Sequence, residues 1–169
     1  MNRGSDLKEA DIQFLIKKAI EAREKAYARY SGFKVGAALL AGTDGAGING
    51  AGIDGFEIES TGSFEEDGYR IFTGCNIENS SYGATICAER AAVCNAISHG
   101  YDRFIAIAIV GGLNSTGING ITYPCGICRQ VLSEFSPDMY VISARSESEY
   151  DMRSLSELLP AAFEADQIK

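Results

Sequence analysis

The segment CAERAAVCNAISHGYDRFIAIAIVG, residues 87–111, joins a helix to a buried strand and decides the fold class. Its first part predicts a helix from about Cys87 to His99 that stops at Gly100, because glycine accepts the left-handed conformation found at helix ends. Its second part, residues 104–111, is a short apolar run bounded by turn residues, which is typical of a buried strand. A helix followed directly by such a strand indicates an α/β arrangement in which helices cover a sheet.

Similar elements extend outward from this unit in both directions. Apolar residues at helical spacing predict an amphipathic helix from Asp6, as its N-cap, to about Tyr30. Short apolar runs predict three more strands, at 33–41, 70–75 and 139–144. Two further helices are expected, one from about Cys125 to Phe135 before Pro137 and a short one from Ser154, where Glu157 completes a capping box. We therefore predict a three-layer α/β fold, in which strands after the first hairpin can run parallel.

The length and composition indicate one domain. A chain of 169 residues with 46% hydrophobic side chains can bury a single core, so residues 1–169 are expected to form one unit. The first residues are polar, which argues against a secretion signal, and no run of 18 apolar residues could span a bilayer. Five cysteines without the spread of a disulfide framework favour metal or redox chemistry in a reducing compartment. We expect a soluble cytoplasmic protein that does not associate with membranes.

The net charge of −8 comes almost entirely from one segment. Residues 41–69 contain seven acidic side chains and no Lys or Arg. We interpret residues 42–68, which are also rich in glycine, as a flexible insertion between two hairpin strands that are usually joined by a short turn. No Lys-Ser or Lys-Thr pair follows these glycines, which argues against a phosphate-binding loop. Because no basic stripe occurs elsewhere, we expect no nucleic-acid partner.

Two cysteine motifs carry the chemistry: TICAER at residues 85–90 and PCGICRQ at residues 124–130. Each begins a predicted helix with a cysteine, and the partial positive charge at a helix N-terminus favours the thiolate that binds metals. Cys125 and Cys128 share one helix face, so a single cation can bridge both sulfurs, and Cys87 completes a set of three. Zinc with three protein ligands keeps a fourth position for an activated water molecule. We therefore predict one catalytic Zn²⁺ per chain.

Three neighbouring residues are expected to support this zinc site. Glu89 follows Cys87 by two residues, near enough to exchange protons with the bound water without ligating the metal, so it is the predicted general acid and base. Three thiolates leave the centre with a net charge of about −1, which calls for compensating donors and positive charge nearby. Arg90 and Gln130 lie beside the ligands in the sequence and are assigned to this surrounding layer.

Less specific explanations apply to several of these residues. A Cys-x-x-Cys pair on its own also occurs in redox motifs and in structural zinc sites. Cys75 and Cys94 are expected to be buried apolar side chains rather than ligands. His99 is the single histidine of the chain, and its position before Gly100 predicts a C-terminal helix cap.

Taken in order, the motifs resemble the small homotetrameric cytidine deaminases of the zinc deaminase superfamily, in the form where Cys-x-Glu replaces His-x-Glu. The resemblance runs through YSGFKVGAALL (30–40), GCNIENSSYGATICAERAA (74–92), PCGICRQVLSEF (124–135) and SELLPAAF (156–163). It implies a three-layer α/β/α fold with a central mixed sheet of about five strands, and a homotetramer. It also implies hydrolytic deamination of cytidine and deoxycytidine to uridine and deoxyuridine plus ammonia, through a zinc-activated water, in pyrimidine salvage.

The resemblance also implies roles for individual residues in binding the nucleoside. Asn76 and Glu78 match a pair that hydrogen-bonds the ribose hydroxyls, with a turn cap and a solvated charge as the alternatives. A buried polar pair that requires a sugar discriminates against the free base. Phe33 matches an aromatic residue that packs on the pyrimidine, with ordinary core packing as the alternative. Tyr82 matches a tyrosine of the site, and Ala88 matches a residue whose backbone contacts the base. Phe163 matches an aromatic residue that reaches a neighbouring subunit's site, with packing in an ordinary core or interface as the alternative.

The sequence departs from the family pattern in three places: the insertion at 42–68, GGLNSTGING at 111–120, and Lys34, where the family commonly has proline. These differences leave substrate range, regulation and assembly open. Rival functions are deamination of a modified nucleoside such as blasticidin S, a non-enzymatic zinc or thiol-redox module, and a polynucleotide-editing or RNA-binding role. The segment 76–79 favours an ordinary ribonucleoside, and the charge balance argues against a polynucleotide. The preference between ribose and deoxyribose is left open by the sequence.

Overall fold

The computed structural model describes residues 7–42, 69–163 and 165–168, and the strands among them form one mixed sheet. The strand order is β2-β1-β3-β4-β5. β3 and β4 are parallel, whereas the other neighbouring strands are antiparallel. The bounds of the strands are Phe33–Gly42 for β1, Tyr69–Cys75 for β2, Arg103–Leu113 for β3, Tyr140–Ser146 for β4 and Glu149–Ser154 for β5.

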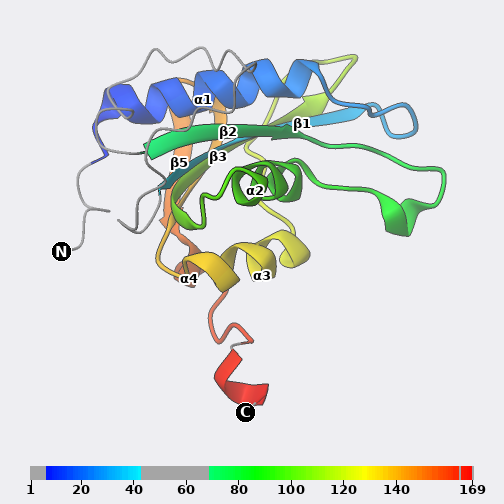
Figure 1. Cartoon of the computed structure of the whole chain (residues 1–169). Coiled ribbons are helices and arrows are strands. Elements are labelled where there is room, and N and C mark those ends of the chain that lie inside the picture. The colour runs from blue at the N-terminus through cyan, green and yellow to red at the C-terminus, as the bar shows by residue number, and fades with distance from the viewer. Residues whose placement is uncertain (1–6, 43–68, 164, 169) are drawn as a thin grey trace.

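Helices cover both faces of this sheet. Helix α1 (Glu9–Glu24) lies on one face, whereas α2 (Ala88–Ser98) and α3 (Gly126–Phe135) lie on the other, as Figure 1 shows. The short helix α4 (Leu155–Leu158) follows β5 and contacts α3. Two 3₁₀ turns, η3 (Tyr82–Ala84) and η4 (Ala165–Ile168), complete the described elements. The predicted three-layer α/β/α fold is therefore confirmed.

Alternating side chains of the central strands build two separate cores. In β1, Leu39 packs into the core shared with α2 and α3, whereas Leu40 packs into the core shared with α1. In β3, Ile107 and Ala108 divide between the two cores in the same way. Because successive side chains of a strand point to opposite faces, a strand buried on both faces is apolar throughout. This explains why β1 and β3 appear in the sequence as continuous apolar runs.

Both helix layers approach the sheet very closely at a glycine. A Cβ atom on Gly74 of β2 would lie 2.4 Å from the carbonyl oxygen of Ala88 and 2.4 Å from the amide nitrogen of Ala92, both in α2. A Cβ atom on Gly36 of β1 would lie 2.1 Å from the carbonyl oxygen of Ala19 in α1. Contacts this short leave no room for a side chain. Gly74 therefore determines how closely the first turn of α2 packs on the sheet.

Most elements match the predictions, and the first helix is the clearest difference. It was expected from Asp6 to about Tyr30, but α1 begins at Glu9 after the N-cap Lys8 and ends at Glu24, and Asp6 lies outside the described residues. The chain leaves the helix early because the Tyr27 N–H donates to the carbonyl oxygen of Asn76 at 3.0 Å. Helical spacing in the sequence could not reveal this long-range bond.

Other differences concern the far edge of the sheet and the insertion. Strand β5 was not among the runs identified from the sequence, because its residues are mostly polar and it is recognised only through its antiparallel pairing with β4. The parallel arrangement expected after the first hairpin applies to β3 and β4 alone. The predicted insertion at 42–68 lies outside the described residues except for Gly42, the last residue of β1.

Two predicted helix ends are confirmed. His99 is the C-cap of α2, and its Nδ1 lies 2.8 Å from the carbonyl oxygen of Asn95. Ser154 is the N-cap of α4, and its hydroxyl and the Glu157 carboxylate form the expected capping box.

Among the described residues, no helix combines the length and apolar character that crossing a membrane requires.

Replacing Gly74 with valine should destabilise the fold by about 1–3 kcal/mol, because the new side chain would push α2 away from β2. The measurement is the free energy of unfolding in urea. Gly120→Ala is the matched control, since a Cβ atom at that position meets nothing within 4 Å. Equal stability of Gly74→Val and the control would contradict the close approach of α2.

Candidate metal centre and active site

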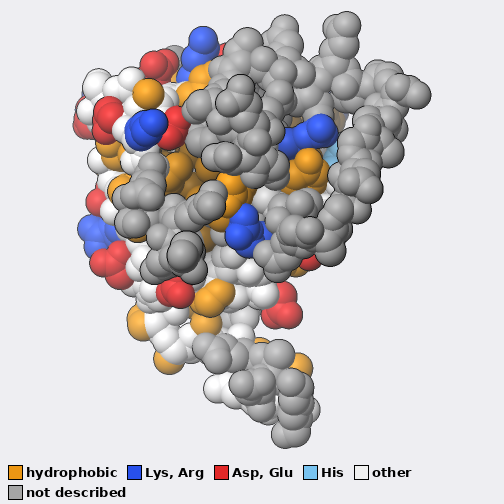
Figure 2. Space-filling view, turned by 60° about the vertical axis from the view of Figure 1, so that its left-hand side comes forward, with side chains coloured by type: hydrophobic (Ala, Val, Ile, Leu, Met, Phe, Trp, Pro, Cys, Tyr) orange, Lys and Arg blue, Asp and Glu red, His pale blue; other side chains and the backbone are white. Residues whose placement is uncertain are grey.

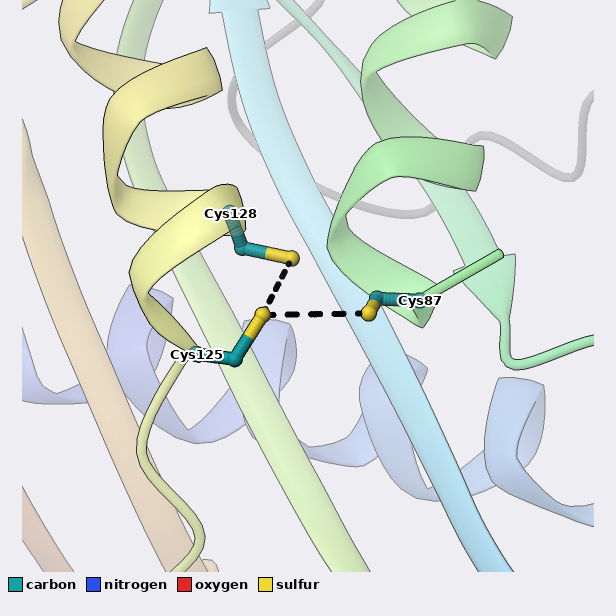
Figure 3. Close-up of side chains that lie close together, drawn as sticks. All are labelled: Cys87, Cys125 and Cys128. Atoms are coloured by element: carbon teal, nitrogen blue, oxygen red, sulfur yellow. Dashed lines mark hydrogen bonds between the residues drawn. The ribbon is translucent and has the colours of Figure 1, made fainter. Parts of the chain in front are cut away.

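Three cysteine sulfurs converge between the N-termini of α2 and α3. Cys87 is the N-cap of α2, and Cys125 is the N-cap of α3, with Cys128 one turn further on. The Cys87 and Cys125 sulfurs are 3.9 Å apart, and those of Cys125 and Cys128 are 3.5 Å apart. Figure 3 shows the three side chains pointing toward one another from the two helices. The predicted set of three sulfurs is thus assembled in space from segments far apart in the sequence.

The spacing of these sulfurs fits tetrahedral zinc. A Zn–S bond of about 2.3 Å places two sulfurs of a tetrahedral site about 3.8 Å apart, which is close to the two sulfur–sulfur separations. The three ligand atoms all lie within 4.8 Å of one another, and no other cluster of His, Cys, Asp or Glu of this kind occurs in residues 7–42, 69–163 and 165–168. The described chain therefore offers three thiolate ligands and leaves the fourth corner of a tetrahedron without a protein ligand.

The surroundings of Cys87 favour its thiolate form. Its pKa is lowered to about 5, first by the neighbouring Cys128 thiol and then by Arg90 and Cys125. The pKa of Cys128 is raised, first because its proton serves the Cys87 sulfur and then because the side chain is buried. The cluster thus loses its first proton easily and retains another. A divalent cation would displace the remaining protons, since metal binding to thiols releases protons.

Arg90 supplies positive charge to this cluster. Its guanidinium donates to the carbonyl oxygen of Thr85 at 2.8 Å and lies 3.8 Å from the Cys87 sulfur. The bond to Thr85 orients the guanidinium, so the charge stays beside the sulfur. The pKa of Arg90 is raised, first by its contact with Cys87. The structure therefore places Arg90 where a compensating charge was expected.

Glu89 is buried in the first turn of α2, with 4% of its surface exposed. Burial raises the pKa of its carboxyl group, the negative charge of Cys87 adds to this shift, and contact with Cys128 opposes it. A carboxyl group with a raised pKa releases and accepts protons closer to neutral pH than an exposed one. Glu89 therefore has both the position and the environment of a proton-transfer group beside the sulfurs.

A short antiparallel bridge joins the expected sugar-binding segment to the residue before Cys87. Ile77 pairs with Ile86, the residue before Cys87, through two main-chain hydrogen bonds of 2.9 and 3.0 Å. The neighbouring residues Asn76 and Glu78 flank this bridge. Asn76 is buried as expected, but Glu78 is partly exposed, so the two residues do not form a fully buried pair.

The remaining predicted residues lie at several depths. Phe33 starts β1 with 36% of its surface exposed and is not a member of either core cluster, which disfavours the core-packing alternative. Ala88 is fully buried at the start of α2. Tyr82 is 76% exposed, and its ring meets the Tyr30 ring edge-on at 6.1 Å between centroids. Phe163 is 59% exposed in the segment after α4.

Gln130 has a partner other than the cluster. Its amide donates to the carbonyl oxygen of Phe163 at 2.8 Å, so it holds the C-terminal segment against α3. Among the described residues, no hydrogen bond from Gln130 to a cysteine sulfur is found. Cys94 was expected to be buried, but it is exposed on α2, and Cys75 is only partly buried.

Arg129 was not identified from the sequence. Its guanidinium donates to the carbonyl oxygens of Pro124 and Leu158, both at 2.8 Å. It therefore ties the residue before Cys125 to α4 and steadies the first turn of α3. A signal was present, because a positive charge near a helix N-terminus is unfavourable unless other groups satisfy it.

Comparison with known proteins agrees with this geometry. Residues 63–144 match the cytidine and deoxycytidylate deaminase zinc-binding region. The cytidine deaminase of Halalkalibacterium halodurans is 41% identical over 159 residues, which cover 94% of this chain and 98% of that protein. The chain belongs to the cytidine deaminase family. A second family member, the cytidine deaminase of Sporosarcina psychrophila, is 38% identical over 94% of this chain and 95% of its own length.

Solved structures of cytidine deaminases share the fold. The enzyme from Burkholderia pseudomallei is 40% identical and superposes with a TM-score of 0.67 over 89% of this chain and 97% of its own. The enzyme from Mycobacterium tuberculosis is 35% identical, with a TM-score of 0.66 over 94% of this chain and 99% of its own. The expected cytidine deaminase family and the α/β fold are thus confirmed for this chain.

Replacing Cys128 with serine should reduce bound zinc from about one ion per chain to less than about 0.1, because two sulfurs hold the ion much less tightly than three. Cys94→Ser is the matched control, since Cys94 lies on α2 away from the cluster, and it should retain zinc. Metal content per chain measures the effect. A chelator should lower the melting temperature of the wild type, and added zinc should restore it. Full zinc occupancy in Cys128→Ser would rule out this ligand set.

Proposed function

We propose that this chain deaminates cytidine and deoxycytidine hydrolytically, giving uridine and deoxyuridine plus ammonia. The observation that carries the proposal is the buried Glu89 beside three converging sulfurs, in a chain similar to cytidine deaminases over nearly its whole length. On the described part of the face in Figure 2, Lys and Arg side chains lie in separate places and form no continuous basic surface. Long polynucleotides are bound by continuous basic surfaces.

Cys87, Cys125 and Cys128 would hold the zinc ion, and the separations of their sulfurs support this assignment. When bound, zinc acidifies a water molecule so that hydroxide is available near neutral pH. The negative charge of three thiolates works against this effect. Arg90 and the N-termini of α2 and α3 reduce that charge at the site, which is the role we assign to them.

Glu89 would move the protons of the reaction. Its carboxylate accepts a proton from the attacking water and delivers it to the ring nitrogen N3 of cytosine. The water oxygen adds to C4 as N3 takes this proton, and C4 then carries both a hydroxyl and the amino group. Glu89 passes the hydroxyl proton to the amino group, the bond from C4 to that nitrogen breaks as the C4=O bond of uridine forms, and ammonia leaves. Burial of Glu89 supports this role, because a carboxyl group with a raised pKa can both accept and return protons.

Asn76 and Glu78 would bind the sugar, although both already hold the main chain. The Asn76 side chain accepts from the Val35 N–H at 2.8 Å and donates to the Phe33 carbonyl at 2.9 Å. An amide group has two donor hydrogens and two acceptor lone pairs, so one of each remains for a ligand. Phe33 would pack against the base, with Tyr82 and the backbone of Ala88 completing the pocket.

A homotetramer is the proposed assembly, by likeness to the family that the sequence resembles. The exposed rings of Phe163 and Tyr82 support it, since exposed aromatic residues are common in interfaces. The proposed location is the cytoplasm. All five cysteines of the chain lie among the described residues as free thiols, and a reducing compartment keeps the proposed ligands in that form.

Glu89→Gln should keep zinc and bind nucleoside while lowering kcat for cytidine by roughly 10²–10⁴-fold, because glutamine cannot carry the proton. Loss of cytidine absorbance in the ultraviolet, with zinc quantified per chain, measures both properties. Glu134→Gln, an exposed change on α3, is the control and should behave as the wild type. Undiminished kcat in Glu89→Gln would exclude Glu89 as the proton carrier.

Faster turnover of blasticidin S than of cytidine by the wild type would exclude an ordinary nucleoside as the substrate.

Arg90→Ala should weaken zinc binding by roughly 10- to 100-fold, because the Cys87 thiolate loses its neighbouring charge. Arg90→Lys should recover part of the affinity, since it restores the charge but not the paired geometry. Competition with a zinc chelator of known affinity measures the change. An unaltered zinc affinity in Arg90→Ala would show that the guanidinium does not support the metal site.

A further inference from the structure

Residues 27–32 form a loop that lies along the proposed sugar-binding segment. The Tyr27 N–H donates to the carbonyl oxygen of Asn76 at 3.0 Å, and the Glu78 N–H donates to the carbonyl oxygen of Tyr27 at 2.8 Å. Tyr27 and Ile77 form an isolated parallel bridge. The loop then returns to the sheet at Phe33, the first residue of β1. It therefore links the sugar-binding segment directly to the aromatic residue proposed to contact the base.

Ser31 joins these two parts through its side chain. Its hydroxyl donates to one oxygen of the Glu78 carboxylate and accepts from the Phe33 N–H at 2.9 Å. The other carboxylate oxygen of Glu78 accepts from the Tyr30 N–H at 2.7 Å and the Ser31 N–H at 3.3 Å. A serine hydroxyl has one donor hydrogen and two acceptor lone pairs, so both Ser31 bonds can exist together. Each oxygen of Glu78 therefore has a fixed partner in the loop.

The carboxylate of Glu78 is consequently held in one orientation while part of it remains free. A carboxylate has about four acceptor positions, and three are occupied by the loop. The pKa of Glu78 is lowered, first by the Ser31 hydroxyl, so the carboxylate is charged at neutral pH. A glutamate side chain that is already ordered loses less conformational freedom when it binds a ligand.

We propose that Ser31 is a positioning residue of this enzyme: its hydroxyl, fixed by the Phe33 main chain, orients the Glu78 carboxylate toward the sugar hydroxyls of the nucleoside. The inference rests on the proposed function, because it assigns the sugar to Glu78. The sequence does not reveal this role, since Ser31 and Glu78 are far apart in the chain and a serine in a loop has many ordinary uses.

The first test is Ser31→Ala, compared with Ser31→Thr, which keeps a hydroxyl group. Ser31→Ala should raise KM for cytidine roughly three- to tenfold and change kcat less than about twofold, which corresponds to the loss of one or two hydrogen bonds that act in binding. Ser31→Thr should recover most of the loss. Ser98→Ala, an exposed serine at the end of α2, is the matched control. Melting temperatures show whether any variant is simply less stable.

The second test asks whether Ser31 acts through Glu78. In a double-mutant cycle, Ser31→Ala should have less than about a twofold effect on KM once Glu78→Ala is present. For 2′,3′-dideoxycytidine, which lacks the 2′ and 3′ hydroxyls of the sugar, Ser31→Ala should likewise change KM little. Equal effects of Ser31→Ala in both backgrounds, or an unchanged KM for cytidine, would overturn the positioning role alone. A wild type that releases no ammonia from cytidine would overturn the proposed function as well.

Discussion

The convergence of two helix N-termini on one point is the constraint on which the site depends. Helix α2 begins after Cys87, and α3 begins after Cys125, so both helices direct the positive ends of their dipoles toward the same sulfurs. This arrangement requires α2 to pack closely on the sheet, which Gly74 permits by presenting no side chain. Backbone packing thus controls the geometry of the cluster, and the thiolates benefit from charges that the fold supplies.

Glu89 is buried in the first turn of the same helix, α2. Ala88 and Ala92 approach Gly74 of β2, and Glu89, buried in the same turn, contacts Cys128. Burial and the adjacent thiolate both raise its pKa, whereas Arg90 partly offsets the negative charge. A zinc site of three thiolates and a buried carboxyl group would be strongly negative without that offset. The local balance of charge therefore depends on Arg90, held in place by the Thr85 carbonyl, together with the two helix N-termini.

Near the proposed sugar contacts, the side chains of Asn76 and Glu78 also bind the main chain. Asn76 binds the backbone at the start of β1, and Glu78 binds the loop before it through Ser31. The same residues therefore fix the backbone around Phe33 and keep polar atoms for the proposed contacts to the sugar. A change at one of them is expected to alter the position of Phe33 together with the contacts to the sugar.

The sequence by itself determined the three-layer fold, the main strands and helices, the cysteine set and the placement of Glu89, because these depend on local periodicity and on motif spacing. Only the tertiary structure decided the early end of α1, the edge strand β5 and the partners of Gln130, Arg129 and Ser31. These features depend on hydrogen bonds between groups distant along the chain. Such bonds leave no periodic pattern in the sequence, so their formation becomes visible only when the folded chain brings the groups together.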